Sequence, residues 1–215
     1  NPHSMGAWST DSKSHVSHME SGDFYGSEQS AIIEKESKVH IEFIDSNGNR
    51  EVLKENLQLL QGEVIDASVM NCGALRSFLS EQLNKAVDED VLFSLHMKAT
   101  MMKVSDPIIF GHCVEAYLGT LMDEHGDALK AVGFNPNNGL SSFYQVLDSL
   151  DTDTQKTIRN SLENIFQERP PLAMVNSDKG ITCLHVPSDV IIDASMPAMI
   201  RTSGQMWGPD GNPKD

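Results

Sequence analysis

The 215-residue sequence carries a net charge of −15 at pH 7, with 39% hydrophobic and 22% charged residues. A chain of this length and composition can bury a sizeable globular core. Its acidic balance, without clusters of Lys or Arg, argues against binding to nucleic acid or to an anionic membrane surface. No apolar run approaches the roughly 20 residues that span a bilayer, and the polar start of the sequence has no apolar signal-peptide segment.

The cysteines indicate the redox compartment of the protein, and the two ends of the sequence indicate whether it is a whole protein or a piece of one. Cys72, Cys113 and Cys183 lie far apart and form no CxxC pair, which favours buried free thiols in a reducing, cytoplasmic compartment. The sequence starts at Asn1 without a methionine and stops in a polar loop. We therefore expect a piece of a longer protein.

The first 30 residues are rich in Ser, His, Gly and Asp and lack periodicity, so we expect an irregular surface segment followed by an α/β core at 31–215. His15 and His18, with His3 and nearby carboxylates, contain the donor types of a metal site. Because an irregular segment fixes no ligand geometry, a surface loop is the better interpretation.

The next stretch predicts a β-hairpin. Residues 39–44 alternate apolar and polar side chains, Asn47-Gly48 supplies a tight turn, and residues 51–53 return. A short apolar run at 62–69 contains Asp66, which is either a turn residue or a second candidate carboxylate, the former being preferred.

Apolar residues at helical spacing predict most of the central elements. A helix around 75–87 precedes a second one after Pro107, with Asp106 as its N-cap and a break at Gly126. The remaining expected helices lie at 127–132, at 143–150 and from a Thr152–Gln155 capping box to the stop at Arg169-Pro170-Pro171.

Between these helices, residues 92–97 alternate as a strand with one buried face and deliver Lys98 to its carboxyl end. Ligand-handling groups of α/β proteins lie at such positions. With a pKa lowered by burial, Lys98 could act as an acid/base or as a Schiff-base nucleophile. Lys103 is the competing candidate, and a solvated lysine on an edge strand is the simpler interpretation.

The C-terminal third predicts short strands at 172–175 and 181–186, then a buried strand at 190–192 that ends in Asp193. Alternating strands and helices favour an α/β domain. A carboxylate at a strand end suits Mg²⁺ or Mn²⁺, although Asp193 is equally suited to capping a helix that starts at Pro197. His96 and His185 are expected to pack or hydrogen-bond rather than to bind metal.

The sequence contains one internal echo and lacks several common site motifs. Val64–Ser68 (VIDAS) is echoed by Ile191–Ser195 (IIDAS), which chance or an old duplication would explain. The sequence contains no GxGxxG fingerprint, no P-loop and no GxSxG elbow, so the common nucleotide and hydrolase motifs are absent.

Several long segments resemble the monomeric NADP-dependent isocitrate dehydrogenases of bacteria. They cover most of the chain and lie in the family's order: residues 3–16, 22–28, 98–107, 174–182, 184–189 and 193–201. The resemblance implies an α/β fold of the isocitrate/isopropylmalate dehydrogenase-like type. It also implies that residues 1–215 are an N-terminal part of the large domain, which faces a second domain across the active-site cleft.

The resemblance places the family's catalytic lysine on Lys98 and one of its three metal-binding aspartates on Asp193. It implies isocitrate as substrate, NADP as cofactor and Mg²⁺ or Mn²⁺ as the metal ion. The partner tyrosine, two further aspartates, the isocitrate-binding arginines and the NADP-phosphate residues match nothing here. We therefore expect a monomeric parent enzyme, no NADP-binding residues in this piece, and no activity from the piece alone.

Two alternatives remain open at this point. The chain could be a non-catalytic binding or assembly module derived from this fold, or a lysine Schiff-base lyase in which borohydride would trap substrate on Lys98. An exposed cleft face could also cause the isolated piece to self-associate.

Overall fold

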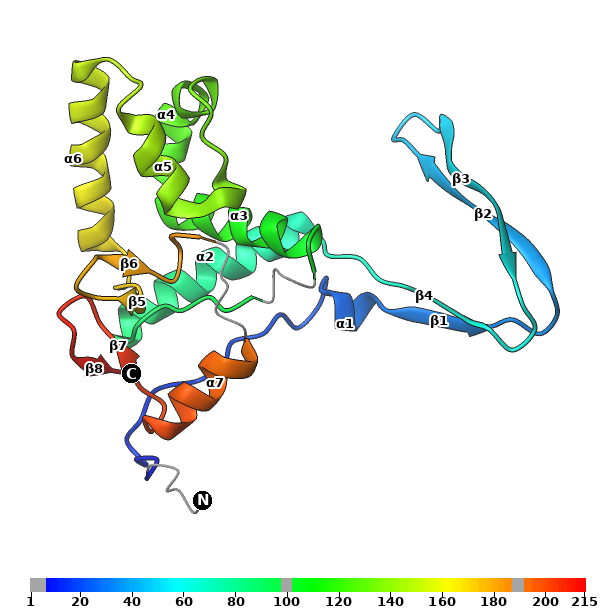
Figure 1. Cartoon of the computed structure of the whole chain (residues 1–215), viewed down its shortest axis with the longest axis horizontal. Coiled ribbons are helices and arrows are strands. Elements are labelled where there is room, and N and C mark those ends of the chain that lie inside the picture. The colour runs from blue at the N-terminus through cyan, green and yellow to red at the C-terminus, as the bar shows by residue number, and fades with distance from the viewer. Residues whose placement is uncertain (1–6, 98–101, 187–191) are drawn as a thin grey trace. The chain divides into compact units, whose positions relative to one another are not determined.

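The computed structural model describes residues 7–97, 102–186 and 192–215, without the side chains of 192–196. The chain divides into two units, Met19–Ala74 and a larger one made of Asn1–His18 with Leu75–Asp215. The boundary expected between the irregular segment and the α/β core, at residue 30, therefore lies inside the smaller unit, which begins at Met19 and ends at Ala74. Figure 1 shows the elements of both units.

The smaller unit is built from antiparallel ribbons. A short helix α1 (Phe24–Ser27) leads into β1 (Gln29–Ile32), which pairs with β4 (Val64–Ala67). Between them lie β2 (Ser37–Ile44) and β3 (Arg50–Leu59), which pair with each other.

The turn of the inner hairpin forms where the sequence predicts it. The Asp45 carboxylate accepts hydrogen bonds from the backbone N–H groups of Asn47 and Asn49, and Gly48 has φ +83°, which glycine adopts without steric cost. The side-chain amide of Asn49 also donates to this carboxylate at 2.8 Å, and this bond, followed by the backbone bonds, holds the pKa of the Asp45 carboxyl below its ordinary value. The predicted hairpin is confirmed.

Helices form most of the larger unit. They are α2 (Cys72–Glu89), α3 (Ser105–Leu118), α4 (Thr120–Ala131), the 3₁₀ turn η1 (Pro136–Asn138), α5 (Gly139–Leu147), α6 (Thr152–Glu168) and α7 (Ile192–Arg201). Within the described ranges, none of the helices is long and apolar enough to cross a bilayer.

The core of the larger unit lies among α3, α4, α5 and α6. Phe143 contacts Phe134 edge-on, with ring centroids 5.5 Å apart, and Leu129 and Ile158 are fully buried. Tyr117 is 1% exposed, and its hydroxyl donates a hydrogen bond to the Pro170 carbonyl at 3.1 Å. Burial raises the pKa of the Tyr117 phenol, so this hydroxyl stays protonated as a donor.

Several helix boundaries differ from the sequence predictions, and α4 and α5 begin at Thr120 and Gly139 rather than at residues 127 and 143. The break after α3 lies at Gly119 (φ +46°), not at Gly126, which is buried inside α4. Only Gly119 occupies a backbone conformation that other residues rarely adopt. Asp106 is the second residue of α3 rather than its N-cap, and Asp151 rather than Thr152 caps α6, by accepting from the Thr154 N–H.

The remaining strands are short. β5 (Met174–Asn176) pairs with β6 (Ile181–Thr182), and β7 (Met206–Trp207) pairs with β8 (Pro213–Lys214), both antiparallel. The strand predicted at 92–97 is reduced to one parallel bridge between Phe93 and Leu172. The chain is a mixed α/β structure, as predicted, with antiparallel pairs in its described sheets.

Cysteine burial is also partly as expected. Cys113 and Cys183 are buried free thiols, whereas Cys72, at the start of α2, is exposed. Burial raises the pKa of the Cys183 thiol to about 11. The two buried thiols are therefore protonated and unreactive at neutral pH.

Candidate functional site

The two predicted site residues lie at the edges of what the structure describes. Lys98 lies outside the described residues, one position beyond Met97. Asp193 is the second residue of α7, so its backbone is helical rather than the end of a strand, and its side chain is not among those described. The helix predicted to begin at Pro197 begins five residues earlier and contains Pro197. The roles of Lys98 and Asp193 remain predictions.

The segments that lead to these two residues are joined by backbone hydrogen bonds. The Phe93 N–H donates to the Pro171 carbonyl, and the Phe93 carbonyl accepts from the Ala173 N–H, both at 2.9 Å. The Ala173 carbonyl in turn accepts from the Cys183 N–H at 2.9 Å. Residues 171–173 therefore connect the segment before Lys98 to the segment before Asp193. We call this arrangement the three-segment junction.

Side chains reinforce the junction. Ala173 is fully buried and Leu172 is 3% exposed. The Cys183 thiol lies 3.6 Å from the Phe93 carbonyl oxygen, to which it donates a weak hydrogen bond. The high thiol pKa keeps this donor protonated, so it bonds the two outer segments of the junction directly.

Hydrogen bonds from the N-terminal end of helix α5 (Gly139–Leu147) hold the segment before Asp193. The N–H groups of Leu140 and Ser141 donate to the carbonyls of Leu184 and His185 at 2.8 and 2.9 Å. These N–H groups lack partners inside the helix because they belong to its first turn. Gly139 permits the approach, since a Cβ there would lie 2.3 Å from the His185 carbonyl oxygen.

His185 is held as a neutral imidazole. Its Nδ1 accepts from the Thr182 backbone N–H at 2.9 Å, so the ring proton lies on Nε2. The ring stacks on Tyr144 with centroids 5.9 Å apart, and burial lowers the pKa of the imidazole. The prediction that His185 packs and hydrogen-bonds is confirmed.

His96 has a comparable environment two residues before Lys98. Its Nε2 lies 2.5 Å from the Ser94 hydroxyl, and burial lowers the pKa of the ring. The hydrogen bond predicted for His96 is therefore confirmed. It fixes the local conformation of the residues that precede Lys98.

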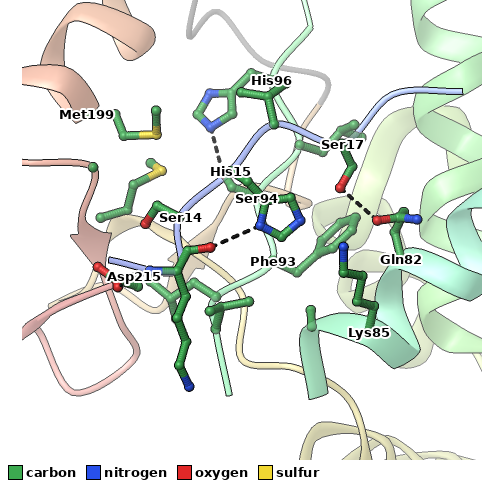
Figure 2. A pocket seen from close by; sticks show the side chains of 18 of the residues that line it. Ser14, His15, Ser17, Gln82, Lys85, Phe93, Ser94, His96, Met199 and Asp215 are labelled. Carbon is green, nitrogen blue, oxygen red and sulfur yellow. Dashed lines mark hydrogen bonds between the residues drawn. The ribbon is translucent and has the colours of Figure 1, made fainter. Parts of the chain in front are cut away.

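A cavity of about 430 Å³ lies beside this segment (Figure 2). It is lined by residues 13–17, one face of α2, residues 91–96, the end of α7 with the turn and strand that follow, and Asp215. Its volume falls in the range of small-molecule sites. Two of its walls belong to the segments that carry Lys98 and Asp193.

Residues 13–17 cross the cavity in an extended course that is fixed at both ends. The Lys13 N–H donates to the Asp215 carboxylate and its ammonium donates to the Glu89 carbonyl, both at 2.8 Å. The Ser17 hydroxyl donates to Gln82 Oε1 at 2.7 Å. Figure 2 shows this segment passing the α2 face and Phe93.

One polar atom on the cavity wall has no hydrogen-bond partner. The hydroxyl oxygen of Ser14 is buried and unbonded, while Nδ1 of its neighbour His15 donates a hydrogen bond to the Lys13 carbonyl at 3.0 Å. A buried hydroxyl without a partner costs roughly 1–3 kcal/mol. This oxygen is therefore a position at which a water molecule or a ligand would gain a hydrogen bond.

The other candidate carboxylate, Asp66, lies in the smaller unit. It is on β4 opposite Ser30, and its carboxylate raises the pKa of Glu28 through a hydrogen bond and charge repulsion. Across the described side chains, no three His, Cys, Asp or Glu residues are grouped as they would be around a metal ion; Asp193 is not among those side chains. The Glu28–Asp66 pair could not be predicted, because Glu28 directly precedes β1 and Asp66 lies on β4, two strands that meet only on folding.

Comparison with known proteins gives the family context. A family model for monomeric isocitrate dehydrogenase matches residues 1–215. Isocitrate dehydrogenase (NADP) 2 of Colwellia maris is 54% identical over 215 residues, and isocitrate dehydrogenase (NADP) of Azotobacter vinelandii is 53% identical over 214. Isocitrate dehydrogenase (NADP) 2 of Mycobacterium tuberculosis is 46% identical over 214 residues. These alignments cover 100% of this chain and 29% of each relative.

Proposed function

Because the chain belongs to the monomeric isocitrate dehydrogenase family, we propose that it forms part of an enzyme that oxidises isocitrate with NADP⁺ and releases CO₂ to give 2-oxoglutarate. The observation that carries this proposal is the match over all 215 residues, with identities near 50% to enzymes of that name. The chain spans 29% of the length of these relatives. The complete activity is therefore assigned to a longer polypeptide, and the 215-residue chain alone is expected to be inactive.

In this proposal Lys98 moves a proton. Its amine would accept the proton of the substrate hydroxyl as that alcohol is oxidised. The fixed segment before it supports this role, because Ser94 and His96 hold the backbone two residues away. A lysine placed within hydrogen-bonding reach of the hydroxyl is the geometry that general-base catalysis requires.

Asp193 supplies a carboxylate to Mg²⁺ or Mn²⁺. The fit is one of donor type, since both ions prefer oxygen ligands, and the backbone of Asp193 lies in the first turn of α7. When bound, the divalent ion acts as a Lewis acid on the oxygen at the reacting carbon. This chain offers one such ligand, so the other protein ligands and the residues that bind NADP belong to the rest of the polypeptide.

The chain is also proposed to be part of the large domain and to reside in the cytoplasm. Three free thiols support a reducing compartment. The domain assignment is supported by the family match and by the larger unit, whose three-segment junction joins the segments before Lys98 and Asp193.

The test is NADPH formation by the full-length gene product with isocitrate and Mn²⁺, in the wild type and in Lys98→Met. General acid–base catalysis is worth roughly 10²–10⁴-fold, so we expect a loss of that size with metal–isocitrate binding retained. Lys103→Met is the matched control, because it removes a lysine five residues away and should leave the rate nearly unchanged.

Each other outcome has a definite meaning. Activity that survives in Lys98→Met but disappears in Lys103→Met transfers the role to Lys103. An inactive wild-type enzyme refutes the dehydrogenase proposal and leaves a binding or assembly module as the function of this fold.

A further inference from the structure

The β2–β3 ribbon of the smaller unit carries a row of apolar side chains along one side of β2, where Lys54 and Glu51 lie opposite Ile41 and Phe43. Val39, Ile41 and Phe43 alternate along β2 on one side, and the β3 residues Leu57 and Leu59 lie opposite Val39 and Ser37 on the same side. We call these five residues the apolar face.

The opposite side of the ribbon is mixed: Glu42 faces Val52 and Ile44 faces Arg50, and its charged groups bond one another. Glu42 accepts from the Arg50 guanidinium at 2.7 Å and lies 2.9 Å from His40 Nε2. Lys38 and Gln58 form a cross-strand pair further along the same face. These polar groups are hydrogen-bonded or exposed to water and need no covering partner.

The apolar face is covered only at one end of the ribbon. Leu59 is 2% exposed, whereas Ile41 is 51% and Phe43 is 53% exposed near the hairpin turn. A two-stranded ribbon is at best marginally stable in water unless its apolar face packs on another element. A long exposed ribbon of this kind is also a site of unwanted association. Both arguments require a partner surface over Ile41 and Phe43.

Charge argues against a second copy of this chain as that partner. Residues 19–74 contain eleven Asp and Glu against four Lys and Arg, which leaves this unit a net charge of −7. Two such units would repel each other on approach. The partner surface should instead be apolar and neutral or basic around its edge.

The length of the relatives identifies the source of such a surface. This chain aligns with 29% of each relative, so about seven-tenths of the family's polypeptide lies outside it. We propose that the apolar face of the β2–β3 ribbon is an internal docking surface for that remaining part of the polypeptide. The inference rests on the proposed function, which makes this chain part of a longer enzyme.

The test compares the reactivity of cysteines placed on the two faces. Phe43→Cys reports the apolar face and His40→Cys, three residues away on the opposite side, is the matched control. Both are made in a Cys72→Ser background, because Cys72 is exposed and would react. Maleimide labelling is followed peptide by peptide by mass spectrometry, in the 215-residue chain and in the full-length gene product, with NADPH formation measured on the same full-length samples.

We expect residue 43 to react at nearly the rate of residue 40 in the 215-residue chain at low micromolar concentration. In the full-length protein its labelling should slow by about 100-fold or more, because labelling then requires local opening, while residue 40 is unaffected. Ile41→Cys serves as a second reporter if Phe43→Cys does not fold.

Two results would overturn the inference. Equal labelling of both faces in an active full-length enzyme refutes docking and leaves the proposed function intact. Protection of residue 43 already in the 215-residue chain would show that the cover comes from this chain itself or from a second copy. Protection that appears only in a full-length protein without dehydrogenase activity supports docking and refutes the proposed function instead.

Discussion

Gly139 is the position at which one added methyl group tests how the segment before Asp193 is held. Its backbone lies at φ 75° and ψ −171°, a region that only glycine populates readily. An alanine Cβ would lie 2.3 Å from the His185 carbonyl oxygen and 2.7 Å from that of Leu184. Neither atom can yield independently, because both oxygens accept hydrogen bonds from the first turn of α5.

The expected cost follows from these two effects. Alanine in such a backbone region costs about 1–3 kcal/mol. Moving the carbonyls away breaks two hydrogen bonds, each worth roughly 0.5–1.5 kcal/mol. Gly139→Ala should therefore lose about 2–6 kcal/mol, a large share of the roughly 5–15 kcal/mol that stabilises a typical domain.

Gly133→Ala is the matched control, because Gly133 has φ +96° and a Cβ there meets no atom within 4 Å. It should show the backbone strain alone. Urea unfolding of the 215-residue chain, followed by helical circular dichroism, measures the loss for each variant. Hydrogen exchange at the amides of Leu140 and Ser141 should accelerate only in Gly139→Ala. Equal losses in the two variants, with unchanged exchange at Leu140, would refute the carbonyl-contact argument.

Three further predictions concern groups in different parts of the chain. Tyr117→Phe removes the hydrogen bond to the buried Pro170 carbonyl and should lower the free energy of unfolding by about 1–2 kcal/mol in urea titrations; no loss would mean that water replaces the hydroxyl. His96 has a pKa lowered from its ordinary value of 6.5 by burial, so the stability it confers is present above pH 6.5 and is lost as the pH falls through its folded pKa. His96→Gln should flatten the dependence of the urea midpoint on pH in that window, and an unchanged slope would assign it to another group. Glu28 has a pKa raised from 4.5 by Asp66, so the two carboxylates repel each other once the pH exceeds the raised value. Glu28→Gln removes this repulsion and should slow amide exchange in β1 and β4 at pH 7 but not below pH 4.5. Faster exchange at pH 7 would contradict this prediction.

Local sequence was sufficient to predict an element where one short segment contains both the alternation of apolar residues and the turn that follows it. The alternation at 39–44, the Asn47-Gly48 turn and the return at 51–53 identify the inner hairpin without reference to the rest of the chain. The apolar stripe from Leu75 to Leu83 likewise identifies α2. Val87, predicted to continue that stripe, is 44% exposed, and Ala86 is buried in its place. An apolar residue at the end of a helix need not face the core.

Local sequence was not sufficient to predict the secondary structure of the two copies of the internal echo. The shared tetrapeptide Ile-Asp-Ala-Ser starts in a strand at Ile65 and is helical at Ile192. In the first copy Ile65 lies opposite Ala31 on β1, a partner that is 34 residues away in the sequence. The second copy is followed by residues 196–201, which continue as a helix. Intrinsic propensity is weak enough for such surroundings to decide.

The three-segment junction could not be derived from the sequence for the same reason. Its hydrogen bonds link Phe93, Ala173 and Cys183, and none of these residues carries a motif. The alternation at 92–97 predicted a regular strand, but only Phe93 has a strand partner. Residues 94–97 leave the ladder, and the side chains of Ser94 and His96 hold the segment in its place.

This arrangement fixes the described segments that precede the two residues proposed to react. In the described parts of these two segments, His96 and His185 each have a neutral ring held by a hydroxyl or a backbone N–H from its own segment. Lys98 follows the first by two residues, and Asp193 follows the second by eight. Substitutions that loosen the second segment, such as Gly139→Ala, should weaken metal–isocitrate binding in the full-length enzyme more than they slow the proton transfer assigned to Lys98.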